Sequence, residues 1–275
     1  MADPINLSSS VRTNLLTLQR TSGFIADTQT RLSTGLRVNT ALDDAAAFFT
    51  AKGLSDNATD FDALKSNIDL AISTIQTAID GIDAISELVN QAKGLASNAK
   101  ATGNTNERST LAVQFNELLS QINTIANDSS FNGTNLLQAS PDNLAVEFNT
   151  DNTSNLTITG LDSTTATSGI NIAVAANNFG LNANIDTALT AISSALTTLR
   201  SNASTMGSRN TILSTRLDFT ENLVNTLEGG TGKLTLADLN EESANLLALQ
   251  TRQQLGINSL ALAAQSERSI LALFG

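Results

Sequence analysis

The chain of 275 residues contains no cysteine, histidine, tryptophan or tyrosine. Without thiols and imidazoles it lacks the usual zinc ligands and the commonest nucleophiles and general bases of enzymes. The absence of cysteine also excludes a disulfide framework, so packing alone has to hold the fold. We therefore expect a protein that is not an enzyme and that uses no cofactor and no metal ion.

Basic residues are scarce as well, with 15 Lys and Arg against 26 Asp and Glu and a net charge of -11. Binding to nucleic acid needs a basic surface that neutralises phosphates, so we expect none. No stretch reaches the roughly 18 to 20 consecutive apolar residues of a membrane helix, and we expect no membrane insertion. The first residues also lack the basic and apolar regions of a secretory signal, so secretion would follow another route.

Aromatic residues make up only 4% of the chain, whereas 41% of it is hydrophobic. In two long segments the aliphatic residues recur in steps of three and four, the spacing of a coiled-coil seam. The first segment spans 61–99 and the second 185–227, which at about 1.5 Å per residue gives helices of roughly 58 and 64 Å. Among the seam residues we count Ile68, Ile75, Ile82, Ile85, Leu118, Ile192, Leu199 and Leu217. The pattern predicts a mainly α fold, an antiparallel long-helix coiled-coil bundle formed by the N- and C-terminal halves.

Further helices are expected near the ends and after the first long segment. A stripe from Val11 to Leu36 predicts an N-terminal helix, 107–126 predicts a third helix, and 236–273 predicts the last. The glycines of 229–232 predict a break in the helix that marks a hinge or linker. The stretch 253–266 has no charge and is apolar around most of its circumference, which indicates burial by several neighbouring chains.

Two parts of the sequence are not explained by heptads. The paired carboxylates Asp43 and Asp44 could form a metal or acid/base pair, but a helix start with Thr40 as the N-cap fits better, because no other ligand type lies nearby. Between 128 and 184, alternation around residues 144–148, 156–158 and 170–174 predicts a small central β-hairpin region of short strands. The Ser and Thr residues there would permit O-linked sugar, whereas the Asn-x-Ser/Thr triplets are common by chance in such a composition.

Three segments resemble the motifs of bacterial flagellin. They are Arg31-Leu-Ser-Thr-Gly-Leu-Arg-Val-Asn-Thr-Ala-Leu-Asp-Asp-Ala-Ala46, Phe131-Asn-Gly-Thr-Asn-Leu-Leu137, and the closing segment from Gln253 to Phe274. Together they cover roughly the first 137 and the last 90 residues in the family's order. The signature positions in the first motif are Arg31, Leu32, Gly35, Asn39, Asp43 and Asp44.

The resemblance implies a structural subunit that polymerises into the helical, extracellular flagellar filament for swimming motility. It implies a terminal-helix inner-tube domain of 1–42 plus 233–275, and a helical rod domain of 43–232 with the β-hairpin region at about 130–183, lacking the family's large outer domains. The implied inner-tube assembly residues are Val11, Leu15, Leu18, Ile25, Leu32, Leu246, Leu249, Leu255, Leu260, Ile270 and Phe274. The implied partners are further copies of the chain, the flagellar type III export apparatus with an export chaperone, and hook-associated and cap proteins.

Where the family's patch for the animal flagellin receptor carries Arg and Glu, this chain has Gln91 and Gly94, so we expect no strong receptor recognition. Two other functions remain open at this stage. A hook-filament junction protein resembles flagellin at both ends but usually differs at Asp43-Asp44-Ala-Ala46. A chemoreceptor-like signalling hairpin is also an antiparallel coiled coil, but it would lack the strand-like middle.

Overall fold

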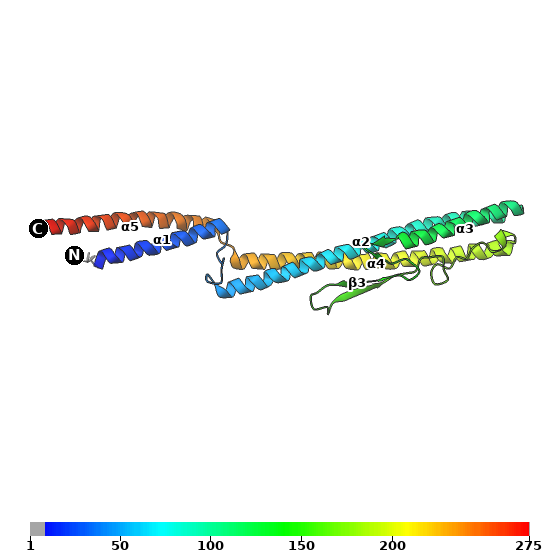
Figure 1. Cartoon of the computed structure of the whole chain (residues 1–275), viewed down its shortest axis with the longest axis horizontal. Coiled ribbons are helices and arrows are strands. Elements are labelled where there is room, and N and C mark those ends of the chain that lie inside the picture. Colours follow the sequence, from blue (N-terminus) through cyan, green and yellow to red (C-terminus); the bar gives the residue numbers. More distant parts are fainter. Residues whose placement is uncertain (1–8, 275) are drawn as a thin grey trace, which may run out of the picture. The chain divides into compact units, whose positions relative to one another are not determined.

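The computed structural model describes residues 9–274, except for the side chains of residues 267, 268 and 270–274. The helices of the described chain are α1 (Ser9–Thr34), α2 (Ala45–Ala101), α3 (Thr105–Asp128), α4 (Asn182–Thr235) and α5 (Leu239–Phe274) (Figure 1). The strands form two antiparallel pairs, β1 (Ser130–Phe131) with β2 (Thr134–Asn135) and β3 (Asn143–Glu147) with β4 (Asn155–Thr159), and a 3-10 helix, η1, spans Ala176–Phe179. This confirms the predicted mainly α fold with a small central β-hairpin region.

The chain divides into two compact units. Unit 1 consists of residues 1–57 and 226–275, and unit 2 consists of residues 58–225. The boundaries predicted from sequence, at 42 and 233, both fall within unit 1. The assignment of the terminal helices to an inner tube is not decided by this division and stays a prediction.

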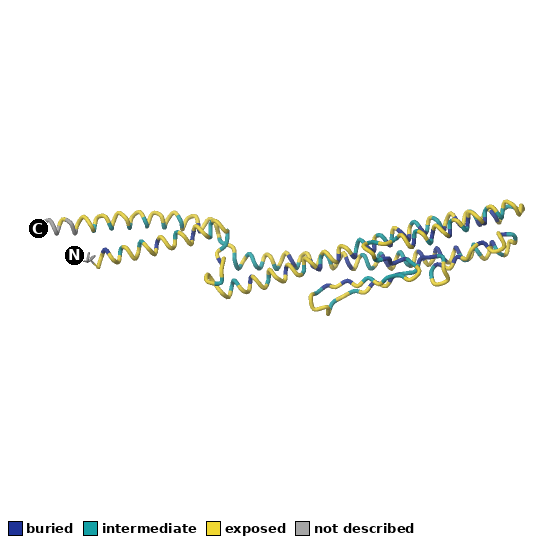
Figure 2. The backbone as a smooth tube through the Cα atoms, viewed as in Figure 1, coloured by how far each residue is buried: buried dark blue, intermediate teal, exposed yellow. Residues whose placement is uncertain are grey.

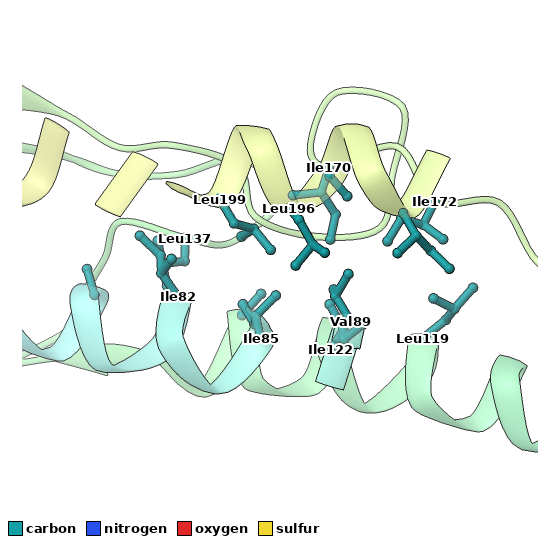
Figure 3. Packing of buried hydrophobic residues seen from close by; sticks show 14 of the residues in the cluster. Ile82, Ile85, Val89, Leu119, Ile122, Leu137, Ile170, Ile172, Leu196 and Leu199 are labelled. Atoms are coloured by element: carbon teal, nitrogen blue, oxygen red, sulfur yellow. The ribbon is translucent and has the colours of Figure 1, made fainter. Parts of the chain in front are cut away.

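Unit 2 has one continuous apolar core to which α2, α3, α4, β3 and β4 contribute, and Figure 2 shows buried positions along these elements. Every seam residue of α2 from Leu64 to Ala99 is buried, since the heptad spacing keeps these side chains on one face. Figure 3 shows Ile82, Ile85 and Val89 of α2 and Leu196 and Leu199 of α4 pointing toward one another. The fold of unit 2 thus follows from the heptad pattern.

Ion pairs at two levels of unit 2 show how α2 and α4 are aligned. Lys100 Nζ lies 2.6 Å from Asp186 Oδ1, and Lys65 Nζ lies 3.8 Å from Glu221 Oε1. The later residue of α2 therefore pairs with the earlier residue of α4, as antiparallel helices require. Both pairs imply the same register between the two helices.

One glycine of α2 is required by close packing. A Cβ on Gly81 would lie 2.3 Å from Ser129 Oγ and 2.8 Å from a methyl carbon of Leu137. The end of α3 and the segment after β2 can therefore approach α2 only where this side chain is absent. Overpacking of this kind costs typically about 1 to 3 kcal/mol.

The predicted hinge at 229–232 is wrong, because α4 continues as a helix to Thr235. These glycines lie close to neighbouring side chains: a Cβ on Gly230 would come within 3.3 Å of Leu54 Cδ1. The Thr231 hydroxyl donates to the carbonyl oxygens of Leu227 at 3.0 Å and of Ala51 at 3.4 Å. Small residues here allow close packing on α2, and that packing offsets the low helix propensity of glycine.

The third predicted strand, at residues 170–174, is also wrong. Ile170 and Ile172 are buried as the alternation suggests, but their backbone amides donate to the carbonyl oxygens of Thr164 and Thr165 within a loop. Alternation of apolar residues predicts which side chains face the core. It does not predict whether the backbone pairs with another strand. The shorter hairpin β1–β2 was not predicted, although its turn is Asn132-Gly133, with φ of 49° and 81°.

Candidate functional site

Helices α1 and α5 of unit 1 lie side by side and bury little of their apolar surface (Figure 2). Within the described residues, the buried positions of α1 are Val11, Thr21 and Thr28. Leu18 rests against Gly256 of α5, where a Cβ would lie 3.2 Å from Leu18 Cγ. The contact is therefore a narrow stripe, and most of the circumference of both helices faces solvent.

The predicted inner-tube residues fall into three groups. Val11 is buried; Leu18, Ile25, Leu32, Leu246, Leu249 and Leu260 are half-buried; Leu15 and Leu255 are exposed. The side chains of Ile270 and Phe274 lie outside the described residues. Other large apolar side chains of the pair are also exposed, namely Leu16, Phe24, Leu239, Leu247, Ile257 and Leu262. The unpartnered apolar surface is thus distributed around both helices.

The signature residue Arg31 joins α1 to α5. Its Nη1 atom donates to Oε1 of Glu242 at 3.0 Å, and Glu242 is only 8% exposed. Glu242 lies in the first turn of α5, where a carboxylate also interacts favourably with the helix dipole. This ion pair links the last turn of α1 to the first turn of α5.

The connector between α1 and α2 is bonded to the connector between α4 and α5. Gly35 ends α1 with φ of 72°, a conformation that favours glycine. The amides of Arg37 and Val38 both donate to the carbonyl oxygen of Thr235, and the amide of Ala237 donates to the carbonyl oxygen of Gly35. Unit 1 is therefore held at its connectors by a short antiparallel bridge and not by a hinge.

The two carboxylates of the signature have separate structural roles. Asp43 Oδ2 accepts hydrogen bonds from the amides of Asn39 at 3.1 Å and Thr40 at 2.8 Å, and from the Thr40 hydroxyl at 3.1 Å. These bonds, led by that of the Thr40 amide, lower the pKa of Asp43 below its ordinary value. Asp44 caps α2, since its Oδ1 atom accepts from the amide of Ala47 at 3.0 Å. The predicted N-cap, Thr40, is wrong, because the chain makes a turn before α2 begins.

The predicted seam residues all belong to unit 2. Ile68, Ile75, Ile82, Ile85, Ile192 and Leu199 are fully or almost fully buried, and Leu118 and Leu217 are half-buried at the edge of the core. On α3 the buried leucine is Leu119, one residue after the predicted one. The structure brings these side chains together in or against the one core of unit 2.

Sequence reasoning missed the residues that hold the β3–β4 hairpin against α4. Arg209 Nη1 donates to the carbonyl oxygen of Thr157 at 3.1 Å, and Arg216 Cζ lies 4.9 Å from the centre of the Phe148 ring. The two arginines are seven residues apart and so share a face of α4. The seven-residue spacing places both arginines on one face of α4, but a charged helical face normally indicates exposure to solvent and not a contact with a hairpin.

Asn135 was missed as well, although it lies within one of the flagellin-like motifs. Its side chain is buried and forms bonds in both directions: Nδ2 donates to the carbonyl oxygens of Ala126 and Asn127, and Oδ1 accepts from the amides of Leu137 and Gln138. The Asn135 side chain therefore links the end of α3 to the segment that follows β2.

Gln91 and Gly94, which stand where the family's patch for the animal flagellin receptor carries Arg and Glu, lie on the surface of unit 2. Gln91 and Gly94 of α2 line a groove that also includes Leu95 and Asn98 of α2, with Gln114 and Glu117 of α3 on the other side.

Within the described residues, no helix is long and apolar enough to cross a membrane, and no three His, Cys, Asp or Glu side chains gather in a group suited to a metal ion.

Two family models match the sequence. The bacterial flagellin N-terminal helical region matches residues 5–142, and the bacterial flagellin C-terminal helical region matches residues 189–274. Flagellin FljM of Caulobacter vibrioides is 34% identical over 98% of both chains, and the flagellin of Brucella melitensis biotype 1 is 31% identical over 97% of both. A crystal structure of Bacillus cereus flagellin superposes with a TM-score of 0.49 at 20% identity, covering 56% of this chain and 88% of that one.

Both family models fall on the helical segments that carry the predicted assembly and seam residues, and the relatives match this chain along almost its entire length. The relatives are named flagellin, which favours this family over a hook-filament junction protein or a signalling hairpin. The chain belongs to the bacterial flagellin family.

Proposed function

We propose that this chain polymerises through the outer faces of α1 and α5, which form the inner part of a helical filament. Membership of the flagellin family makes the chain a structural subunit of the flagellar filament that assembles with copies of itself. The proposal adds which surface drives assembly. The supporting observation is the exposed apolar surface of the α1–α5 pair, including Leu247, Leu255 and Leu262.

A single chain can cover only part of the apolar surface of its own terminal helices. A pair of helices buries one stripe on each partner, and the remaining apolar side chains stay in water until other chains cover them. Each large aliphatic side chain that becomes buried contributes roughly 1.5 to 3 kcal/mol. Several such residues on each copy would together offset the entropy lost when the terminal helices are ordered and the copies associate.

We further propose that the filament is extracellular, that it serves swimming motility, and that the chain reaches the cell surface through the flagellar type III export apparatus. An export chaperone would cover α5 before assembly, because the same apolar face would otherwise associate prematurely. Hook-associated and cap proteins would hold the two ends of the filament. The exchange of Arg and Glu for Gln91 and Gly94 supports weak recognition by the animal receptor, and a structural role without catalysis fits the absence of histidine and cysteine.

Seeded polymerisation of the purified chain tests the assembly role. Short fragments of the chain's own polymer are added to monomer, and growth is followed by light scattering and negative-stain electron microscopy. We expect long tubes that extend from seeds. Monomers that remain unchanged, or closed oligomers of fixed size, would reject the proposed function. Expression in a flagellin-deficient bacterium then tests export and motility, with restored swimming as the expected result.

A further inference from the structure

Three well-exposed large apolar side chains stand on the long helices of unit 2. Leu70 of α2 is 47% exposed, and Ile212 and Phe219 of α4 are 43% and 59% exposed. They are the only such residues on the described α2 and α4 within unit 2. The register that pairs Lys65 with Glu221 puts Leu70 opposite residue 216, between Ile212 and Phe219. All three therefore lie in one short band of unit 2.

Leu70 forms part of a groove in this band whose lining is both apolar and polar, the polar residues being Asn67, Thr74, Asn132, Thr134 and Glu147. The groove has a volume of about 220 Å³ and lies between α2, the turn of the β1–β2 hairpin, and strand β3. Its apolar lining includes Leu70 and Ala71 of α2, Phe131 of β1, and Leu144 and Val146 of β3. Phe131 is half-buried and lines the groove, and an aromatic side chain from a partner would pack favourably against its ring.

Ile212 and Phe219 form a ridge on a different surface of the band. They are seven residues apart, which is close to two helical turns, and therefore lie on one face of α4. This face lies about 60° around the helix from the face of Arg209 and Arg216, which bind the β3–β4 hairpin. The ridge is thus on the α4 side of the hairpin, whereas the groove is between the hairpin and α2.

We propose that the Ile212–Phe219 ridge of one copy docks into the Leu70–Phe131–Leu144 groove of a second copy of this chain. The proposal rests on the proposed polymerisation, because the family membership makes a second copy the expected occupant. A contact between two different surfaces is heterologous, and it can repeat along an open helical assembly without closing into a dimer. The ridge and the groove are two different surfaces and can form such a repeating contact, whereas a single self-complementary patch would close into a dimer.

The negative charge of unit 2 limits which contacts can hold neighbouring copies together. Residues 58–225 carry 16 acidic and 7 basic side chains, so neighbouring units repel each other. Attraction between units must therefore come from apolar or hydrogen-bonded contacts. On the two long helices such apolar surface is confined to this band, and it would fix the lateral alignment of neighbouring copies.

Cysteine cross-linking tests the contact directly, since the natural chain has no cysteine. Monomers with Leu70→Cys are mixed with monomers with Phe219→Cys, polymerised on seeds, and oxidised. We expect a disulfide-linked dimer of the two variants in polymer and not in dilute monomer. The control pair Ser97→Cys and Thr190→Cys is exposed on the same helices outside the band and should form little of it. Equal cross-linking of both pairs, or none in polymer of the 70/219 pair, would overturn the proposal.

A second measurement covers the case in which the cysteine variants polymerise poorly. Phe219→Ser should raise the critical concentration about tenfold or more while the monomer keeps its melting temperature, because the ring is exposed in the free chain. Leu181→Ser is the matched control, since Leu181 is also 59% exposed but lies outside the band. An unchanged critical concentration for Phe219→Ser would contradict the contact. Failure of the unsubstituted chain to polymerise would instead reject the proposed function, and this inference with it.

Discussion

Units 1 and 2 differ in how much apolar surface each buries by itself. Unit 2 has a continuous core with large residues such as Phe115, Ile122 and Phe179 at 0% exposure. In the described part of unit 1, the buried apolar residues are Val11, Val38 and Ala51. Ordering a residue costs about 1 to 2 kcal/mol of backbone entropy, which burial has to offset. We therefore expect unit 2 to be stable alone and the terminal helices of unit 1 to depend on other copies.

The two units also differ in charge. Unit 2 has a net charge of -9, from 16 acidic and 7 basic residues, whereas unit 1 has 10 acidic and 8 basic residues and a net charge of -2. Copies of a nearly neutral, apolar unit can approach closely, and copies of an acidic unit repel each other and remain soluble. Association of unit 2 with other copies is therefore limited to local apolar contacts, whereas the charge of unit 1 opposes association far less.

The largest effect is expected from Leu260→Asp in α5. The half-buried leucine would be covered further by neighbouring copies, and a carboxylate buried there without a partner costs several kcal/mol in every subunit. We expect no polymer on seeding, while the melting temperature of unit 2 in the monomer stays unchanged. Leu260→Met is the control and should polymerise. Normal tubes from Leu260→Asp would show that α5 does not drive assembly.

The core of unit 2 is tested by Ile75→Ala. Ile75 is fully buried in the seam of α2, and its truncation leaves a cavity that costs roughly 2 to 5 kcal/mol. The free energy of unfolding of the monomer, measured with denaturant, should fall by that amount. Leu70→Ala, at an exposed position on the same helix, should change it little. Similar losses for the two variants would contradict the described core.

The ion pair between Arg31 and Glu242 is expected to have a smaller effect. Glu242 is buried but the Arg31 side chain is 39% exposed, so solvent screening limits the interaction to about 1 kcal/mol or less. A double-mutant cycle with Arg31→Met and Glu242→Gln, read out as the critical concentration for polymerisation, isolates the pair. A coupling energy of zero would mean that the pair does not hold α1 to α5.

The smallest effect concerns Asp43 in the connector of unit 1. Because hydrogen bonds from the Thr40 and Asn39 amides lower the pKa of Asp43 below 3.8, the charged form stabilises the folded connector. This contribution is complete above the unfolded pKa and is lost as the pH falls through the lower folded pKa. The Thr40 amide resonance should titrate with a midpoint below 3.8 and should lose this transition in Asp43→Asn. A midpoint above 3.8 would contradict the described hydrogen bonds.

The sequence predicted those elements in which side-chain spacing alone determines the structure. The heptads of 61–99 and 185–227 gave the core of unit 2, because a period near 3.5 allows only one buried face per helix. The break at Gly229–Gly232 was wrong, because close packing against Leu54 and Ala51 overrides glycine's local preference. The strand at 170–174 was wrong for a similar reason: burial does not reveal hydrogen-bond partners.

The candidate site was predictable only in part. Apolar positions on α1 and α5 could be recognised from their spacing, as could a carboxylate near a helix start. The pairing of Arg31 with Glu242, the Thr235 carbonyl that receives two connector amides, and the two arginines under the hairpin join residues far apart in sequence. Local patterns carry no information about such partners. They become visible only when the antiparallel alignment of the helices is known.

Amide hydrogen exchange, measured by mass spectrometry on monomer and on polymer, tests the central claim that unit 2 is stable alone and the terminal helices are not. We predict fast exchange in α1 and α5 of the monomer and strong protection of both in the polymer. The segments of α2, α3 and α4 within 58–225 should be protected in both states. Protection of α1 and α5 in the free monomer equal to that of unit 2 would contradict the account.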